Sequence, residues 1–200
     1  IYGLNNTSTC ADYDYFLMQD KSMPQDLKGI KKPILGFIGY IDNWVDIKLI
    51  EYAANFNKKW QIVLIGPARM DISSIARMSN VHIIERKPYR LMPSYIEHFD
   101  VCLVPFKINK LTNAVNPLKI YEYLALGKPV VATATAEMEY FKGLIDVASS
   151  REEFVSKIDF ILNSPVINVE LQRNRIKEFA HDNTWDQRGR QVIKIIQGNL

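Results

Sequence analysis

The stretch NPLKIYEYLALGKPVV, residues 116–131, joins a helix to a strand and decides the fold class. Asn116 suits an N-cap, and Pro117 suits the first helical position, where its missing N–H is not needed. Gly127 can take the left-handed conformation that ends a helix, and Pro129 prevents the helix from continuing. The apolar run after the second proline is typical of a buried parallel strand. The stretch therefore predicts a buried helix followed directly by a buried strand.

The same alternation of strand and helix extends over most of the chain. Short apolar runs typical of buried strands alternate with segments of helical periodicity. The expected strands are 34–39, 61–67, 81–84, 100–105, 128–133 and 144–147. The expected helices are 46–56, 71–78, 92–98, 117–126 and 149–162, with two more near 169–180 and 185–197. Strict alternation predicts an α/β fold, a doubly wound parallel sheet of the Rossmann-like type.

Two regions of different texture divide the chain. Residues 1–32 contain polar clusters with Pro24 and Gly29 and little periodic structure, so we expect a connecting segment there. We expect residues 33–200 to form one domain with helices at its C-terminal end, an ordinary size for a single core. In such sheets ligands bind beyond the carboxyl ends of the strands, so function is expected in the loops there. The loops concerned follow Gly39, Gly66, Ile84 and Pro105.

The composition is that of an ordinary globular protein, with 48% hydrophobic residues, 24% charged residues and a net charge of +3. Because the charge is small and the basic residues are scattered, nucleic acid is not an expected partner. Neither the two cysteines, Cys10 and Cys102, nor the three histidines have metal-ligand spacing. We expect no metal and no cofactor. The sequence has no run of eighteen apolar residues and no signal-peptide pattern, so a cytoplasmic location is expected.

Lys119 and Glu122 stand out because almost every other side chain of their helix is apolar or aromatic. Three residues apart, they share one face. A lysine in the first turn opposes the helix dipole, and an anionic group near that end would remove the conflict. The free amides of the first turn favour a phosphate. A carboxylate one turn deeper can accept hydrogen bonds from two hydroxyl groups of a ribose. An ordinary Lys–Glu surface pair explains the same spacing equally well.

Segment 116–131 resembles the donor-site helix of glycosyltransferase family 4 and its relatives with the GT-B fold. The resemblance is greatest to a bacterial branch of the teichuronic-acid-biosynthesis type, and it extends over 36–46, 80–84 and 99–106, and loosely over 5–16. It implies the C-terminal, donor-binding half of a GT-B enzyme, which holds a nucleotide-diphosphate sugar, with UDP-sugar as the expected partner. It also implies an acceptor-binding N-terminal domain and is compatible with peripheral association at the inner face of the membrane.

The resemblance also assigns roles to individual residues. Glu122 matches the glutamate that binds the ribose hydroxyls, while Ala114 stands where the family's other glutamate meets the donor sugar. Lys119 is then expected to meet most of the diphosphate charge. The nucleobase is placed near Arg86 and Tyr89, although packing explains the tyrosine equally well. The expected substrate-binding residues are Gly39, Tyr40, Arg86, Tyr89, Thr112, Asn116, Pro117, Leu118, Lys119 and Glu122. No catalytic residue is assigned.

These features predict the donor domain of a glycosyltransferase that moves a sugar to a glycan or lipid-linked acceptor in surface polysaccharide synthesis. A nucleotide-sugar epimerase shares this fold, but the acidic and histidine residues that it uses around the sugar cannot be placed. A non-catalytic flavodoxin-like binding domain is the third alternative. Proximity of donor and acceptor supplies much of the rate of transfer, so we expect the chain alone to be inactive.

Overall fold

Six parallel strands pair into one sheet in the computed structural model, which describes residues 13–164, 176–179 and 181–198. The strands are β1 (Ile34–Ile38), β2 (Gln61–Ile65), β3 (Val81–Ile84), β4 (Val101–Val104), β5 (Val130–Thr133) and β6 (Asp146–Ala148). Their order across the sheet is β3-β2-β1-β4-β5-β6. The sheet therefore grows in one direction up to β3 and in the other from β4, and a crevice opens where the direction changes. The prediction of a doubly wound parallel sheet is confirmed.

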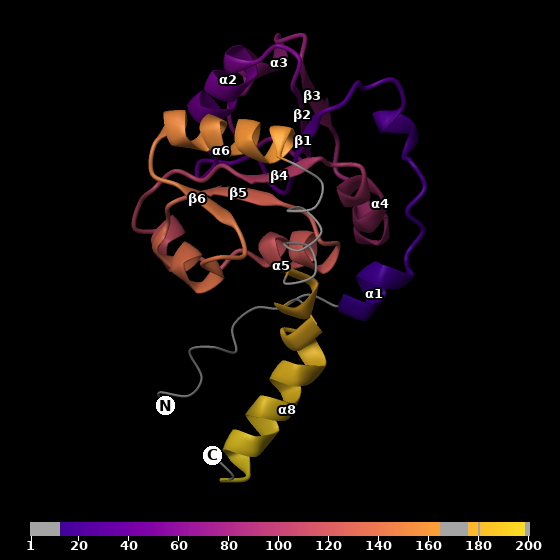
Figure 1. The fold of residues 1–200 in the computed structure, drawn as a ribbon, viewed down its shortest axis with the longest axis vertical. Helices are drawn as coiled ribbons and strands as arrows, with labels where there is room; N and C mark the ends of the chain where they lie inside the picture. Colours follow the sequence, from indigo (N-terminus) through magenta and orange to yellow (C-terminus); the bar gives the residue numbers. More distant parts are fainter. Residues whose placement is uncertain (1–12, 165–175, 180, 199–200) are drawn as a thin grey trace.

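Helices cover both faces of this sheet, with α2 and α6 on one face and α4 and α5 on the other (Figure 1). The α-helices are α1 (Tyr13–Met18), α2 (Ile47–Phe56), α3 (Ser73–Ala76), α4 (Met92–Glu97), α5 (Leu118–Ala125), α6 (Arg151–Asn163) and α8 (Trp185–Ile196). Short 3-10 turns are η1 (Gln25–Leu27), η2 (Tyr89–Leu91), η3 (Thr112–Ala114) and η4 (Ala136–Phe141). In the part of the chain described here, no helix is long and apolar enough to span a membrane.

The register of the central strands brings two loops together. β1 and β2 pair along their whole length, which puts Ile38 beside Ile65. The amide of Gly39 continues the ladder by donating to the Ile65 carbonyl at 2.9 Å, and Gly66 donates to Ile84 at the same distance. The loops after β1 and β2 therefore leave the sheet side by side. They form one wall of the crevice.

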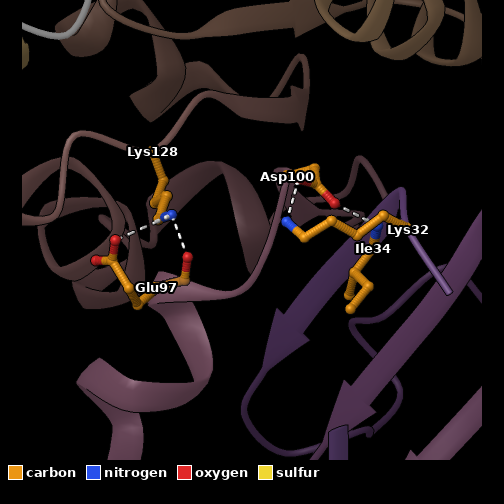
Figure 2. A network of polar contacts seen from close by, with 5 residues as sticks. All are labelled: Lys32, Ile34, Glu97, Asp100 and Lys128. Atoms are coloured by element: carbon orange, nitrogen blue, oxygen red, sulfur yellow. Dashed lines mark hydrogen bonds and ion pairs between the residues drawn. The ribbon is translucent and has the colours of Figure 1, made fainter. Parts of the chain in front are cut away.

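A polar network ties the opposite, amino ends of the strands (Figure 2). Asp100, directly before β4, accepts from the Ile34 amide at 2.7 Å and pairs with Lys32 at 2.6 Å. Lys128, in the loop that enters β5, donates to the carbonyl oxygen of Glu97 at the end of α4. These contacts hold β1 against β4 and α4 against β5 at the end of the sheet remote from the crevice.

Helix α5 ends as its sequence predicts. Gly127 has a φ of 64°, in the left-handed region. Its amide donates to the Leu124 carbonyl at 2.9 Å, and the Lys128 amide donates to the Tyr123 carbonyl at 3.0 Å. This pair of bonds is the Schellman motif, in which a glycine satisfies the last carbonyl groups of a helix.

The amino end of α5 differs from the prediction. The helix begins at Leu118 with Pro117 as its N-cap, so the assignment of Asn116 as the N-cap and of Pro117 to the first turn was wrong. Pro117 is extended, with a ψ of 116°, which shortens the helix by one residue. The Asn116 side chain donates to the Glu137 carboxylate at 3.2 Å instead.

The segment before β1 has more regular structure than its composition indicates. It contains α1 and η1, and the side chains of Phe16 and Leu27 have no exposed surface. Helix α1 contacts α5, and the expectation of an irregular leader was therefore wrong for this part of it. The helix expected near 169–180 lies mostly outside the described residues. The division of the chain at residue 33 stays a prediction.

Candidate functional site

A cavity of about 410 Å³ opens at the carboxyl ends of β1 and β2, against the first turn of α5. Its walls come from the loops after β1, β2 and β3 and from α5. Seven of the ten residues expected in the substrate site line it: Gly39, Tyr40, Arg86, Tyr89, Leu118, Lys119 and Glu122. They come from three regions far apart in the sequence. The topology alone brings them together at the switch in strand order.

Tyr123 anchors α5 over this cavity. Pairing between β1 and β4 extends only over Leu35 and Gly36, so the Ile38 amide is available to another acceptor. The Tyr123 hydroxyl accepts from that amide at 3.0 Å, in a fully buried position. The bond fixes the height of α5 relative to the end of β1. It thereby sets where Lys119, one turn earlier, meets the loop after β1.

Lys119 is a half-buried cation in an aromatic setting. Its Nζ lies 4.1 Å from the centre of the Phe37 ring and 4.9 Å from that of Phe106. Desolvation lowers the pKa of this lysine to about 7, while the charge of Glu122 acts in the opposite direction. Among the ion pairs within 4 Å in the described residues, none includes Lys119. The simple Lys–Glu surface pair is therefore not formed, and the amine faces the cavity without a counter-ion.

Two glycines make room for this amine and for the loops around it. A Cβ on Gly39 would lie 2.8 Å from the Nζ of Lys119, and the residue has a φ of 145°. A Cβ on Gly66 would lie only 2.2 Å from the carbonyl oxygen of Gly39. The backbone of the two loops can approach each other, and a ligand, because neither position carries a side chain.

Glu122 lies one turn deeper in the same cavity. Its carboxyl group is buried, with 7% of the residue exposed. Burial raises the pKa of Glu122 above its usual range, while a hydrogen bond from Tyr89 and the charge of Lys119 act to lower it. A buried carboxylate needs hydrogen-bond donors, and hydroxyl groups of a ligand in the cavity would supply them.

The other three expected residues line a second cavity, of about 340 Å³, on the far side of Lys119. They are Thr112, Asn116 and Pro117, and Trp44 and Phe106 contribute apolar walls. The Thr112 hydroxyl donates to the Lys107 carbonyl and accepts from the Asn109 amide at 3.0 Å. It therefore shapes its own loop. Lys119 and Leu118 belong to both cavities, which are thus adjacent.

The sequence model of the family Glycosyl transferases group 1 matches residues 32–164. The chain belongs to this family. A similar curated protein bears the name teichuronic acid biosynthesis glycosyltransferase TuaH, from Bacillus subtilis (strain 168), and is 32% identical over 190 residues. That alignment covers 88% of this chain and 45% of TuaH, so the chain spans about half the length of this relative. The predicted resemblance to a glycosyltransferase family is confirmed.

Solved structures of glycosyltransferases have the same fold as this group 1 domain. Anabaena Alr3699/HepE, in complex with UDP and glucose, has a TM-score of 0.74 and 15% identity, over 94% of this chain and 55% of that one. Sucrose-phosphate synthase from Thermosynechococcus elongatus has a TM-score of 0.73 and 15% identity, over 96% and 51%. A glycosyltransferase from Rickettsia africae has a TM-score of 0.72 and 15% identity, over 94% and 55%. The expected relation to the GT-B fold is confirmed.

Sequence reasoning missed several residues of the main cavity of this group 1 domain. Gly66 and Pro67 line it from the loop after β2, and Lys87 lines it from the segment after β3. A glycine at the end of each of two apolar runs was the one available signal for Gly66. Lys87 was not named, although it lies between Arg86 and Tyr89 in the segment where the resemblance places the nucleobase, and it forms an ion pair of 2.7 Å with Asp26 in the leader.

Proposed function

We propose that this chain is the donor-binding half of a glycosyltransferase and that it holds a nucleoside diphosphate sugar in the cavity beneath α5. One observation carries the proposal: Lys119, which forms no ion pair within 4 Å in the described residues, and the buried Glu122 open into a single cavity at the amino end of a helix. One group suits an anion and the other suits hydroxyl groups. Membership of a transferase family favours this reading over an epimerase or a flavodoxin-like binding domain.

The diphosphate is assigned to the space between Lys119 and the loops that begin at Gly39 and Gly66. The free amides at the start of α5 and the positive end of its dipole attract a phosphate. Lys119 adds a charge, and its desolvated position strengthens the attraction because little water screens it. The two glycines let phosphate oxygens come close to the backbone.

The nucleoside is assigned to the remaining part of the same cavity. Glu122 accepts hydrogen bonds from the two ribose hydroxyls, and the base lies against the segment that contains Arg86 and Tyr89. Uridine is the proposed base, since a solved protein of the same fold was obtained with UDP. The sugar then extends past Lys119 toward the second cavity, which contains Thr112, Asn116 and Pro117.

The acceptor is proposed to be a glycan or a lipid-linked glycan in surface polysaccharide synthesis, in the cytoplasm at the inner face of the membrane. The name of TuaH, with its reference to teichuronic acid biosynthesis, supports this assignment. An N-terminal domain of the same enzyme is the proposed acceptor-binding partner, because this chain covers 45% of TuaH. Transfer requires both substrates to be held together.

Calorimetric titration of the 200-residue chain with UDP, ADP and GDP tests the proposal. We expect UDP to bind best and the chain alone to transfer no sugar from UDP-glucose. Glu122→Ala should weaken UDP by about 1.5–3 kcal/mol and should scarcely affect 2′,3′-dideoxy-UDP, which lacks the proposed hydrogen-bond partners. Absence of UDP binding, or an equal loss for the ribose and dideoxy ligands, would overturn the assignment of this cavity.

A further inference from the structure

The leader helix α1 packs against Tyr89, a residue of the cavity wall. The ring of Tyr15 stacks on that of Tyr89, with centres 5.9 Å apart and an angle of 13° between the planes. The ring of Phe16 meets the same tyrosine edge-on, with centres 5.7 Å apart. Phe16 is completely buried, which anchors α1 in this position. Figure 1 shows α1 next to α5, the helix that carries the two principal site residues.

Tyr89 connects this aromatic contact to the floor of the cavity. It lines the cavity, and its hydroxyl hydrogen-bonds with the buried carboxyl group of Glu122. With α1 in place, Tyr89 is 48% exposed, and Tyr15 and Phe16 supply two of the ring contacts that hold it. Stacking against Tyr15 restricts the rotamer of Tyr89, and such aromatic pairs add to stability beyond their burial. The orientation of the hydroxyl therefore depends on α1.

A second contact between the leader and a residue of the cavity wall comes from η1. Asp26 pairs with Lys87 at 2.7 Å and accepts a hydrogen bond from the Tyr95 hydroxyl. Lys87 lines the cavity, while Tyr95 is buried in α4. Hydrogen bonds from these two side chains lower the pKa of Asp26 below its usual range. A second residue of the cavity wall thus takes its position from the leader.

We propose that residues 13–27 form part of the nucleotide site, with Tyr15 as a positioning residue that acts through Tyr89 on Glu122. The inference rests on the proposed function of the cavity. Tyr15 touches no ligand in this arrangement. It holds the Tyr89 hydroxyl against the carboxyl group, so that the carboxylate oxygens keep the direction in which they meet a vicinal diol. Its contribution should therefore concern ribose recognition and leave phosphate recognition unchanged.

Titration of Tyr15→Ala with UDP and with 2′,3′-dideoxy-UDP tests this role. The ratio of the affinity for UDP to that for 2′,3′-dideoxy-UDP should fall by about three- to tenfold, the range that corresponds to the loss of one aromatic pair. Tyr15→Phe keeps the stacked ring and should restore the preference. Tyr13→Ala is the matched control, because Tyr13 lies on the same helix but packs edge-on against His181, 5.8 Å away. It should leave the preference unchanged while lowering the melting temperature to a similar extent.

Tyr89→Phe gives a second test that does not disturb α1. This substitution keeps the stacked rings and removes only the hydroxyl. It should reduce the preference for UDP over 2′,3′-dideoxy-UDP as Tyr15→Ala does. In the Tyr89→Phe background, Tyr15→Ala should cause no further narrowing, since the connection is already broken. The inference would be overturned if Tyr15→Ala caused a further loss of the same size in the Tyr89→Phe background. It would also be overturned if Tyr89→Phe alone left the preference for UDP over 2′,3′-dideoxy-UDP unchanged.

Failure of the inference and failure of the proposed function give different results. If UDP does not bind the unsubstituted chain, the assignment of the cavity falls, and the inference with it. If UDP binds and Tyr15→Ala behaves like Tyr13→Ala, the cavity assignment stands. In that case α1 only stabilises the fold, and the proposed positioning role is wrong.

Discussion

At the residue scale, Lys119 is a desolvated cation that opposes the dipole of its own helix. It lies in the first turn of α5, where the helix dipole opposes a positive charge, and two aromatic rings replace water around its amine. Cation–π contacts offset part of the desolvation. Under the proposed function, an anion in the cavity removes more of the conflict. The residue is therefore adapted to the ligand-bound state more than to the empty one.

Substitution of Lys119 should affect phosphate recognition specifically. We expect Lys119→Ala to weaken the binding of UDP by about 1.5–3 kcal/mol, the scale of a hydrogen bond to a charged group. The loss should be smaller for UMP than for UDP, and added salt should reduce the difference. Lys58→Ala is the control, because the exposed Lys58 only donates to Asn55. Equal titration curves for the two variants would contradict the assignment.

The ionisation of Lys119 predicts a pH dependence of stability. Its pKa is about 7 in the folded chain and 10.5 in an ordinary setting. Between these values the unfolded state binds more protons, so the contribution of Lys119 to folding stability rises with pH over this range. Urea unfolding at several pH values between 6.5 and 10 should show the parent chain gaining stability relative to Lys119→Met. A constant difference between the two proteins would show that the amine keeps its ordinary pKa.

The affinity for UDP should change in the opposite direction over the same range. Binding needs the charged amine, and the fraction of charged Lys119 in the empty cavity falls as the pH rises above about 7. Affinity should therefore decrease from pH 7 to pH 9, where the phosphate itself no longer titrates because its second pKa is near 6. Lys119→Met should bind weakly at both pH values.

At the element scale, features that local sequence determines could be predicted, whereas features that depend on tertiary contacts could not. The end of α5 follows from Gly127 and Pro129 alone, because a glycine takes φ of 64° without steric cost. At the start of α5, the Asn116 side chain donates to Glu137 on another element instead of capping the helix, and no local pattern indicates that contact. Helix α1 depends on burial of Phe16, and a six-residue segment has too few periods to reveal a helix.

The contact between the loops after β1 and β2 makes Gly66 a sensitive position. In Gly66→Ala the new Cβ would lie 2.2 Å from the Gly39 carbonyl oxygen, at a φ of 140° that side chains rarely adopt. Because backbone must move, we expect a loss of at least about 1–3 kcal/mol in unfolding free energy. UDP binding should weaken as well, since the proposed position of the diphosphate lies between the same loops.

Gly189→Ala is the matched control for this substitution. Gly189 lies inside α8, and a Cβ there would meet no atom within 4 Å. It should leave stability unchanged or raise it by about 0.5–1 kcal/mol, because alanine is the better helix former. Denaturant unfolding of both variants makes the comparison. Similar effects of the two substitutions would mean that the loops rearrange without cost.

At the scale of the whole molecule, the site is a product of topology. Seven of the ten residues that the sequence marked come together in one cavity because parallel strands end at one edge and the order reverses between β1 and β4. That rule is general, which is why the cavity was predictable. The resemblance marked the segment that contains Lys87, but the ion pair of Lys87 with Asp26 was not predictable, since no local pattern encodes it.

The fluorescence of Trp44 should report on the second of the two adjoining cavities. Trp44 is half-buried and lines the second cavity, whereas Trp60 is buried before β2, at the opposite end of the sheet, against Phe56. Emission from Trp44 should therefore change when a sugar occupies the space beside Lys119, while that from Trp60 should not. We expect UDP-sugar to shift the emission spectrum more than UDP, and Trp44→Phe, unlike Trp60→Phe, to abolish that difference. A single fluorescence titration would then distinguish occupation of the sugar side from occupation of the nucleotide side, without any label.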